Sequence, residues 1–123
     1  MPSLNFQARF ADAVERGEKC QTIRRAGKCE VGDELELVWE GRRLGTSVCT
    51  SIDEIVIDGN HNEAGDLISG WLTINGFPEI MLDHEAQRDG FTSFRELAHW
   101  FDETYGLPFE GQIIRWKPPE PGQ

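Results

Sequence analysis

The chain has 123 residues, 38% of them hydrophobic, which suits one compact core and excludes a disordered protein. Its formal net charge of −10 disfavours long duplex DNA as a partner, because affinity for the phosphate backbone comes mainly from Lys and Arg. No apolar run approaches the roughly 20 residues that span a bilayer, and the first residues lack the pattern of a secretion signal. We therefore expect a soluble, cytoplasmic protein with no membrane partner.

The cysteines and histidines do not follow metal-binding patterns. The three cysteines contain no C-x-x-C pair, and their odd number argues against a disulfide framework, so we expect reduced thiols. Residues 61–63 (HNE) match only the first half of a zinc deaminase motif, and a loop is the better interpretation. His99 stands alone in a helical pattern, which is typical of a structural imidazole. We expect no metal and no cofactor.

The first elements in chain order are a short strand and a helix. Within residues 6–17, apolar side chains recur at i, i+4, i+7 and i+8, which predicts one buried helical face. Gly17 is placed as the left-handed residue that ends this helix. Residues 20–24 then predict a strand that leads into a polar loop. In residues 32–41, apolar side chains alternate with acidic ones, which predicts a half-buried strand.

The second half is also rich in predicted strands. Residues 43–59 form a long β-rich run after a turn at Gly41, and residues 66–76 predict a shorter strand. A glycine inside that shorter strand, Gly70, suggests a bulge. Residues 109–116 predict the last strand of the domain.

Residues 92–106 give the clearest helical pattern of the chain. Ser93 and Glu96 have the spacing of a capping box, and Gly106 is placed to end the helix. The predicted inner stripe consists of Phe94, Leu97 and Phe101.

The order strand, helix, four strands, helix, strand predicts the α+β class. Helices inserted between mostly local strands argue against a doubly wound parallel sheet. We expect a single-domain mixed β-barrel, with two or three helices packed on it, over residues 1–117. Residues 118–123 are proline-rich and predict a flexible tail.

The segment 16–25 (RGEKCQTIRR) concentrates reactive and basic side chains. It belongs to a basic stretch, residues 19–43, that suits a small anionic or nucleoside ligand better than duplex DNA. A threonine hydroxyl needs a neighbouring base to act as a nucleophile, and Lys19 could serve Thr22 if burial lowered its pKa. Residues three apart in a strand face opposite sides, so the two converge only if Lys19 lies in the turn before the strand.

The residues alone leave a simpler alternative open. In that interpretation Lys19 is solvated, Thr22 is an ordinary strand residue and Arg24 pairs with an acidic side chain. Isolated motifs of this length often occur without a function, and the spacing alone favours the simpler alternative.

Three segments taken together resemble a known family. Residues 4–24 combine an apolar start, a helix, Gly-x-Lys and Thr-Ile-Arg; residues 31–37 place Gly-Asp before a strand; and residues 88–106 place an acid-Gly-aromatic turn before a helix ending in Tyr-Gly. This order and spacing resembles the ASCH domain family, a branch of the PUA-like β-barrels, over roughly residues 3–117. The matching positions of the first segment are Gly17, Lys19, Thr22, Ile23 and Arg24.

The resemblance implies an activity and a set of site residues. The chain is similar to the small bacterial N(4)-acetylcytidine amidohydrolases, in which a Lys and a Thr act together with an acidic residue from the later turn. Carried over, these are Lys19, Thr22 and Asp89, although relatives usually have Glu in that turn, and Glu85 is the alternative. The implied reaction is hydrolysis of the N-acyl amide of a modified cytidine, with Thr22 as the nucleophile and Lys19 as its base.

The resemblance also leaves other functions open. Arg24, Arg25 and Cys20 are expected to contact substrate, and Cys20 is a rival nucleophile. Other ASCH proteins are proposed to bind or cleave RNA, so a non-catalytic RNA- or nucleotide-binding module and a ribonuclease are alternatives. The expected partner is thus a small modified nucleoside or single-stranded RNA. Burial of Lys19 distinguishes an enzyme from a phosphate-binding module, because a catalytic base must be desolvated whereas a phosphate-binding lysine is exposed.

Overall fold

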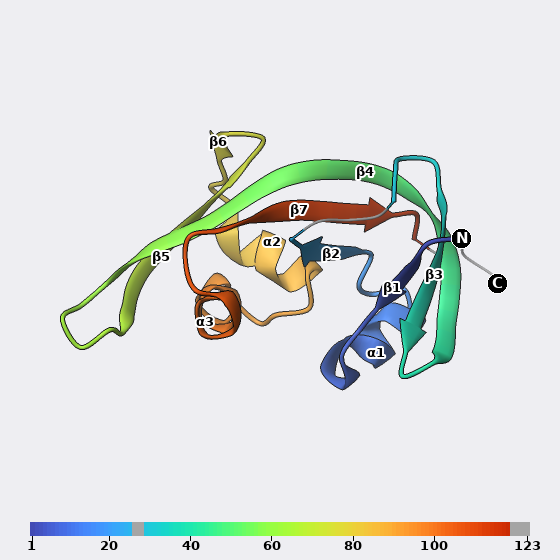
Figure 1. Cartoon of the computed structure of the whole chain (residues 1–123), viewed down its shortest axis with the longest axis horizontal. Helices are drawn as coiled ribbons and strands as arrows, with labels where there is room; N and C mark the ends of the chain where they lie inside the picture. Colours follow the sequence, from blue (N-terminus) through green and yellow to red (C-terminus); the bar gives the residue numbers. More distant parts are fainter. Residues whose placement is uncertain (26–28, 119–123) are drawn as a thin grey trace.

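The computed structural model describes residues 1–25 and 29–118, and their fold is α+β, as predicted (Figure 1). Three helices and seven strands occur in these residues. Their order is β1 (Ser3–Asn5), α1 (Ala8–Glu15), β2 (Gln21–Arg24), β3 (Glu34–Trp39), β4 (Arg42–His61), β5 (Leu67–Ile74), β6 (Phe77–Pro78), α2 (Leu82–Arg88), α3 (Phe94–Tyr105) and β7 (Phe109–Trp116). The predicted tail, residues 118–123, lies outside the described residues except for Pro118.

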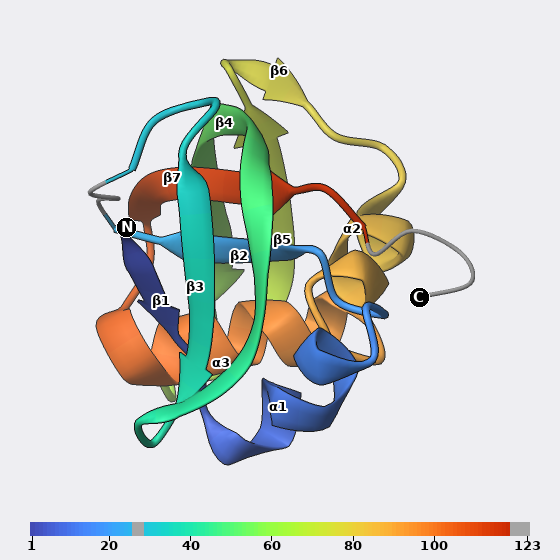
Figure 2. The same ribbon diagram turned by 90° about the vertical axis from the view of Figure 1, so that its right-hand side faces the viewer.

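One strongly curved sheet contains all seven strands. The 20-residue strand β4 pairs with β3, β7 and β5 along its length, and β7 also pairs with β2. Among the strand pairs of the described residues, only β1–β3 is parallel. Figure 2 shows β3 and the first part of β4 crossing in front of β2 and β7 at a steep angle. Pairings among the described residues do not close the sheet, so the structure gives an open curved sheet where we expected a barrel.

The helices lie beneath the arch that β4 and β7 form in Figure 1, and the core fills the space between them. Side chains from the sheet and from α3 make up its most buried part. Burying such aliphatic and aromatic side chains contributes roughly 1.5–3 kcal/mol each. The largest fully buried hydrophobic side chains are Phe101, Phe109, Leu35, Ile55, Ile57, Leu72, Leu97, Ile113 and Ile114. Among the described residues, no helix is long and apolar enough to cross a membrane.

The N-terminal helix α1 ends as the sequence predicts. Gly17 has a φ of 76°, its N–H donates to the Val14 carbonyl, and the Lys19 N–H donates to the Ala13 carbonyl. These bonds satisfy the last carbonyls of the helix and turn the chain sharply toward β2. The helix begins at Ala8, two residues later than expected, and Phe6 instead packs its ring edge against Trp116.

Helix α3 confirms its predicted ends with one difference at the cap. The Ser93 side chain accepts a hydrogen bond from the Glu96 N–H at 3.1 Å. The Glu96 carboxylate accepts from the Thr92 N–H, one residue earlier than a standard capping box requires. Gly106 follows with a φ of 81° and ends the helix.

The segment from the start of β5 to α3 differs from the sequence prediction in two ways. Helix α2 and the two-residue strand β6 were not expected, because α2 has only seven residues and its N-cap residue, Met81, makes no side-chain capping hydrogen bond. Gly70 is not a bulge: it pairs regularly with Gly59, and the register shifts instead between Asn60 and His61. A Cβ at Gly70 would lie 3.2 Å from the Phe94 ring, so the glycine allows α3 to pack closely on β5.

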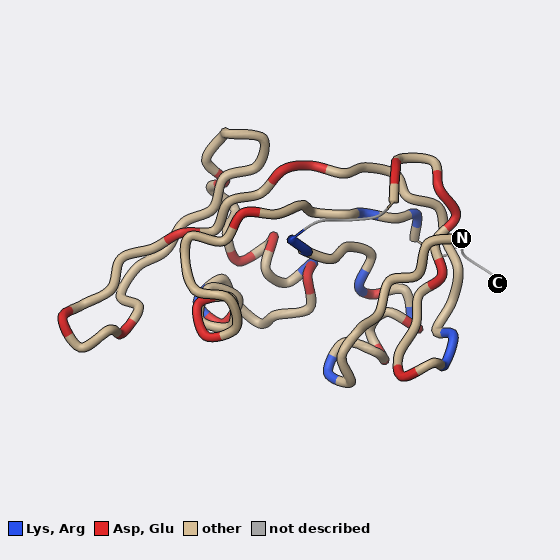
Figure 3. Tube along the Cα trace, in the orientation of Figure 1, with Lys and Arg blue, Asp and Glu red and all other residues tan. Residues whose placement is uncertain are grey.

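Charge is distributed unevenly over this fold. No Lys or Arg occurs between Arg43 and Arg88, a stretch that contains most of β4, all of β5 and most of α2. Figure 3 shows acidic residues alone on the projecting β4–β5 hairpin, and basic residues among α1, β2 and the β3–β4 turn. The positive charge of an acidic protein is thus gathered near the N-terminal elements, where the candidate site lies.

Candidate active site

A cavity of about 320 Å³ lies between α1, β2, α3 and the turn that follows α2. Five of the six expected site residues line it, namely Lys19, Thr22, Arg24, Arg25 and Asp89. Its volume is at the small end of the range for ligand pockets, enough for one nucleoside-sized molecule. The remaining lining residues are Asn5, Phe6, Gln7, Phe10, Ile23, Phe91, Trp100, Phe101 and Tyr105.

Lys19 is almost fully buried, with 2% of its surface exposed. Its position follows from the end of α1: the turn at Gly17 places Lys19 before β2 begins. The amine donates to the Asp89 carbonyl oxygen, lies 3.4 Å from the Asp89 Oδ1 atom and stands 4.7 Å from the Phe10 ring centroid. Burial lowers the pKa of Lys19, and the Asp89 carboxylate opposes this shift.

Asp89 is held beside Lys19 by the turn after α2. Asp89 caps the C-terminus of that helix, and Gly90 follows with a φ of 97°, a conformation that favours glycine. A Cβ at Gly90 would lie 2.8 Å from the Phe10 ring, so only glycine lets the turn approach α1 this closely. Burial raises the pKa of Asp89, while Lys19 and a hydrogen bond from Gln21 oppose the rise.

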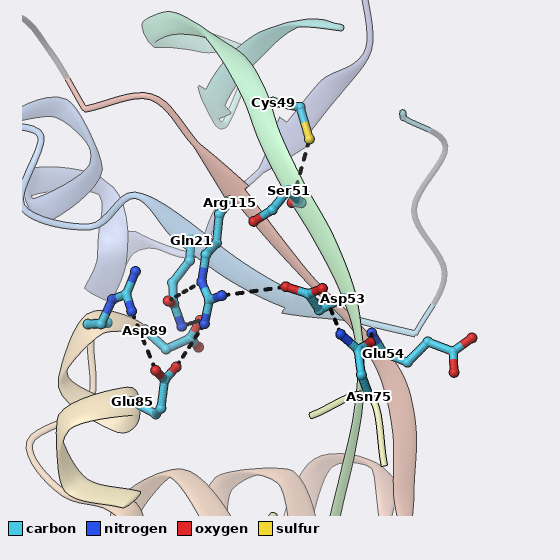
Figure 4. Close-up of polar contacts among 10 residues, drawn as sticks. Gln21, Cys49, Ser51, Asp53, Glu54, Asn75, Glu85, Asp89 and Arg115 are labelled. Carbon is cyan, nitrogen blue, oxygen red and sulfur yellow. Dashed lines mark hydrogen bonds and ion pairs between the residues drawn. The ribbon is translucent and has the colours of Figure 1, made fainter. Parts of the chain in front are cut away.

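A row of polar side chains connects Asp89 to the sheet (Figure 4). The Gln21 amide donates to Asp89 Oδ1 at 3.4 Å and accepts from Arg115 Nε at 3.3 Å. Gln21 and Arg115 face each other across the β2–β7 pair, and Arg115 also forms ion pairs with Glu85 at 3.1 Å and Asp53 at 3.5 Å. Because Glu85 is engaged with Arg115 and does not line the cavity, the structure places Asp89 as the acidic neighbour of Lys19.

Thr22 is buried and lines the same cavity as Lys19. Gln21 and Thr22 are neighbours in β2, and successive residues of a strand point to opposite faces of the sheet. The Thr22 side chain therefore points away from the face that carries Gln21 and its pairing partner Arg115. No direct hydrogen bond joins the Lys19 amine to the Thr22 hydroxyl in the described part of the chain, where the amine bonds to Asp89. Transfer of a proton between these two groups would require a bridging water or a movement of the lysine.

The two arginines that follow Thr22 occupy different positions. Arg24 donates from Nη2 to the Asn5 carbonyl at 2.6 Å and lies 5.2 Å from the Phe6 ring centroid. Its Nε atom is buried and has no hydrogen-bond partner among the described residues. Arg25 is exposed, and its guanidinium lies over the Tyr105 ring at 4.9 Å. Among the described residues Arg24 forms no ion pair with an acidic side chain, in contrast to the simpler alternative, and its hydrogen bond goes to a backbone carbonyl.

Cys20, the rival nucleophile, is oriented differently. Its sulfur donates to the Gly17 carbonyl at 3.3 Å, and the residue does not line the cavity. Burial raises the pKa of the Cys20 thiol, which disfavours the reactive thiolate.

Sequence reasoning missed the aromatic wall of this cavity. Phe10 and Phe91 make an edge contact with centroids 5.6 Å apart, and Trp100 lies 6.0 Å from both Phe91 and Tyr105. The helical pattern of α3 identified its inner stripe, but Trp100 and Tyr105 lie beside that stripe. Only the packing of α3 near α1 and β2 shows that these rings border the basic segment.

Comparisons of the chain with protein-family models, curated proteins and solved structures gave no match. The chemistry of the site must therefore be judged from its geometry. Its reactive groups are a desolvated amine, a hydroxyl and a carboxylate within one aromatic-walled cavity. Within residues 1–25 and 29–118, no cluster of three or more His, Cys, Asp or Glu side chains could hold a metal ion.

Proposed function

We propose that this protein is an ASCH-type amidohydrolase that removes the acyl group from N(4)-acylated cytidine. The observation that carries the proposal is the burial of Lys19 in a cavity that Thr22 also lines. A lysine that serves as a base must lose its proton near neutral pH, and burial lowers its pKa in that direction. A lysine that only holds a phosphate would be exposed to solvent, so the burial supports catalysis over simple binding.

The proposed reaction has two steps. Neutral Lys19 takes the proton of the Thr22 hydroxyl, and the Thr22 oxygen attacks the acyl carbon. The bond between that carbon and the exocyclic nitrogen then breaks, and the nitrogen leaves with the proton held by Lys19. A water molecule then gives a proton to Lys19 and attacks the carbon of the Thr22 ester, the bond between that carbon and the Thr22 oxygen breaks, and Lys19 returns the proton to that oxygen. The carboxylic acid leaves and ionises in solution, which restores the enzyme.

Two neighbouring residues have supporting roles in this mechanism. The negative charge that develops on the acyl oxygen needs a donor, and the Arg24 Nε–H, which lacks a partner among the described residues, is the candidate. Asp89 holds the lysine through its carbonyl and carboxylate oxygens and thereby fixes the direction of the amine. The aromatic side chains of the wall suit the flat face of a pyrimidine base, which stacks on such rings.

The test is an assay of the purified protein with N(4)-acetylcytidine, following the appearance of cytidine and acetate. We expect hydrolysis by the wild-type protein and by Cys20→Ala, and loss of hydrolysis in Thr22→Ala with partial recovery in Thr22→Ser, which restores a hydroxyl. Activity that survives Thr22→Ala and disappears in Cys20→Ala would assign the nucleophile to the thiol. A wild-type protein that leaves acetylcytidine intact but binds or cleaves RNA would overturn the proposal in favour of the RNA-directed alternatives.

A further inference from the structure

The cavity carries more positive charge than the proposed reaction needs. Lys19 and Asp89 form an ion pair, so their charges offset each other. Arg24 and Arg25 line the same cavity, and neither forms an ion pair with a carboxylate among the described residues. Two uncompensated guanidinium groups at one cavity are notable in a chain whose net charge is −10.

Arg25 is the more accessible of the two. It is exposed and lies against the Tyr105 ring, which is itself 44% exposed, so the pair stands at the rim of the cavity. The central carbon of the guanidinium lies over the ring, and Arg25 forms no side-chain hydrogen bond to another described residue, so its N–H groups are free to donate to a ligand. Such an edge is suited to the oxygen atoms of a phosphate, which it can bind through two parallel hydrogen bonds.

Arg24 contributes charge from deeper in the wall. Its Nη2 atom is occupied by the Asn5 carbonyl, so Arg24 is anchored and cannot swing outward to replace Arg25. Arg9, which lies near the site, is already paired, because its Nη2 atom lies 3.0 Å from the Glu96 carboxylate. Among the described residues that line the cavity, Arg25 is therefore the cation with freedom to contact a ligand group outside its buried part.

We propose that Arg25 forms a phosphate subsite at the rim, so that the substrate is an N(4)-acylated cytidine nucleotide and not the free nucleoside. The inference rests on the proposed function: the base occupies the cavity beside Lys19 and Thr22, and the sugar phosphate reaches Arg25. The surrounding acidic surface repels anions elsewhere on the protein, which leaves this rim as the favoured place for a phosphate. The phosphate belongs either to a mononucleotide or to an RNA strand.

The experiment compares kcat/KM for four substrates: N(4)-acetylcytidine, its 5′-monophosphate, its 3′-monophosphate and a short RNA with one internal acetylcytidine. We expect at least one phosphorylated substrate to be preferred over the nucleoside by about tenfold, the value of one charge-assisted hydrogen bond. The preference should come mainly from KM and shrink as salt is added. A mononucleotide preferred over the RNA identifies a free nucleotide, and the reverse identifies a strand.

Arg25→Gln should reduce the ratio of kcat/KM between the preferred substrate and the nucleoside to about one. The matched control is Arg43→Gln, because Arg43 is exposed near the start of β4, pairs with Glu36 and does not line the cavity. Arg43→Gln should leave the ratio as in the wild type. A wild-type ratio near one, or a ratio that Arg25→Gln does not change, would overturn the phosphate subsite while leaving the amidohydrolase proposal intact.

Binding measured by calorimetry separates the two proposals if no hydrolysis occurs. Cytidine 5′-monophosphate, cytidine 3′-monophosphate and cytidine are titrated into the wild-type protein, Arg25→Gln and Arg43→Gln. Tighter binding of a monophosphate than of cytidine, lost in Arg25→Gln alone, would support the subsite even if the proposed reaction failed. Equal affinity for all three ligands would overturn it.

Discussion

Two concave regions of the described structure differ in both size and chemistry. The larger is a groove of about 1000 Å³ between β5, α2 and α3, whereas the candidate active site measures about 320 Å³. Exposed apolar side chains contribute much of the groove: Ile68, Ile80 and Met81 are 64%, 87% and 60% exposed. The smaller cavity instead contains Lys19 and Asp89, two buried charged groups whose pKa values burial shifts.

This difference shows that volume and reactivity are separate properties of a surface. The large groove offers room for a ligand, and although Asp66, Asp83, His84 and His99 also line it, none of these four residues is buried. Burying a charged pair costs free energy that a purely structural role rarely requires, so buried charges in a cavity mark chemistry. The proposed reaction is therefore placed in the smaller cavity, and the following experiments test that difference between the two regions.

The largest expected effect is the loss of hydrolysis on replacing Lys19. Lys19→Ala should lower kcat by roughly 10²- to 10⁴-fold, the usual contribution of a general base. Lys19→Arg should lose nearly as much, because arginine keeps the charge but cannot give up its proton. Circular dichroism checks that each variant is folded. If Lys19→Arg retains most of the wild-type rate, Lys19 anchors the substrate electrostatically and another group activates Thr22.

Sequence patterns identified most of the fold, and the reasons for the failures are local. The ends of α1 and α3 were predictable because Gly17 and Gly106 adopt left-handed conformations that helix ends favour. Helix α2 was missed because seven residues are too few to show a period. Closure of the sheet depends on pairings between distant strands, and no local pattern determines it.

The candidate site was predictable only in part. The turn at Gly17 and the burial of Lys19 agree with the expectation that a catalytic lysine lies in that turn and is desolvated. The family resemblance indicated Asp89 as the acidic neighbour of Lys19. Gln21 and Arg115 could not be found from sequence, because they meet across the β2–β7 pair, 94 residues apart in the chain. The aromatic wall was hidden for the same reason.

The next effect concerns stability and distinguishes the buried ion pair from exposed ones. Lys19→Met leaves Asp89 buried without its partner and should lower the free energy of unfolding by about 3–5 kcal/mol, measured with urea. Adding Asp89→Asn removes the unpaired charge and should recover most of the loss without recovering activity. The control is Arg42→Met, whose exposed pair with Glu15 should be worth about 1 kcal/mol or less. Equal losses in Lys19→Met and Arg42→Met would contradict a special cost at the cavity.

A smaller effect tests how closely the turn after α2 must approach α1. Gly90→Ala adds a Cβ that meets the Phe10 ring at 2.8 Å and forces alanine into a φ of 97°. We expect a loss of about 1–3 kcal/mol in the free energy of unfolding, together with reduced kcat. Gly76→Ala is the matched control, because its φ of 83° imposes similar strain with no atom within 4 Å of the new Cβ. If the two variants lose equal stability, the backbone conformation and not the contact with Phe10 explains the glycine.

The pH dependence of the rate links Asp89 to the base. Burial lowers the pKa of Lys19, so kcat should rise with pH through a midpoint below 10.5 as the amine loses its proton. The Asp89 carboxylate favours the charged amine, so Asp89→Asn should move this midpoint to lower pH while also lowering the maximal rate. Comparing normalised profiles separates the two effects. A midpoint that stays in place, or moves to higher pH, would show that the titrating group is not the lysine beside Asp89.

The smallest expected effect lies in the large groove. Ile80→Ser and Met81→Gln change exposed side chains, so each should alter the free energy of unfolding by no more than about 0.5 kcal/mol. If the reaction takes place in the small cavity, kcat/KM for acetylcytidine should change less than about twofold, which is close to the error of the assay. A fall of tenfold or more in either variant, with the fold intact, would mean that substrate occupies the groove. Lys19 and Asp89 would then be a structural pair, and the larger concavity would be the working site.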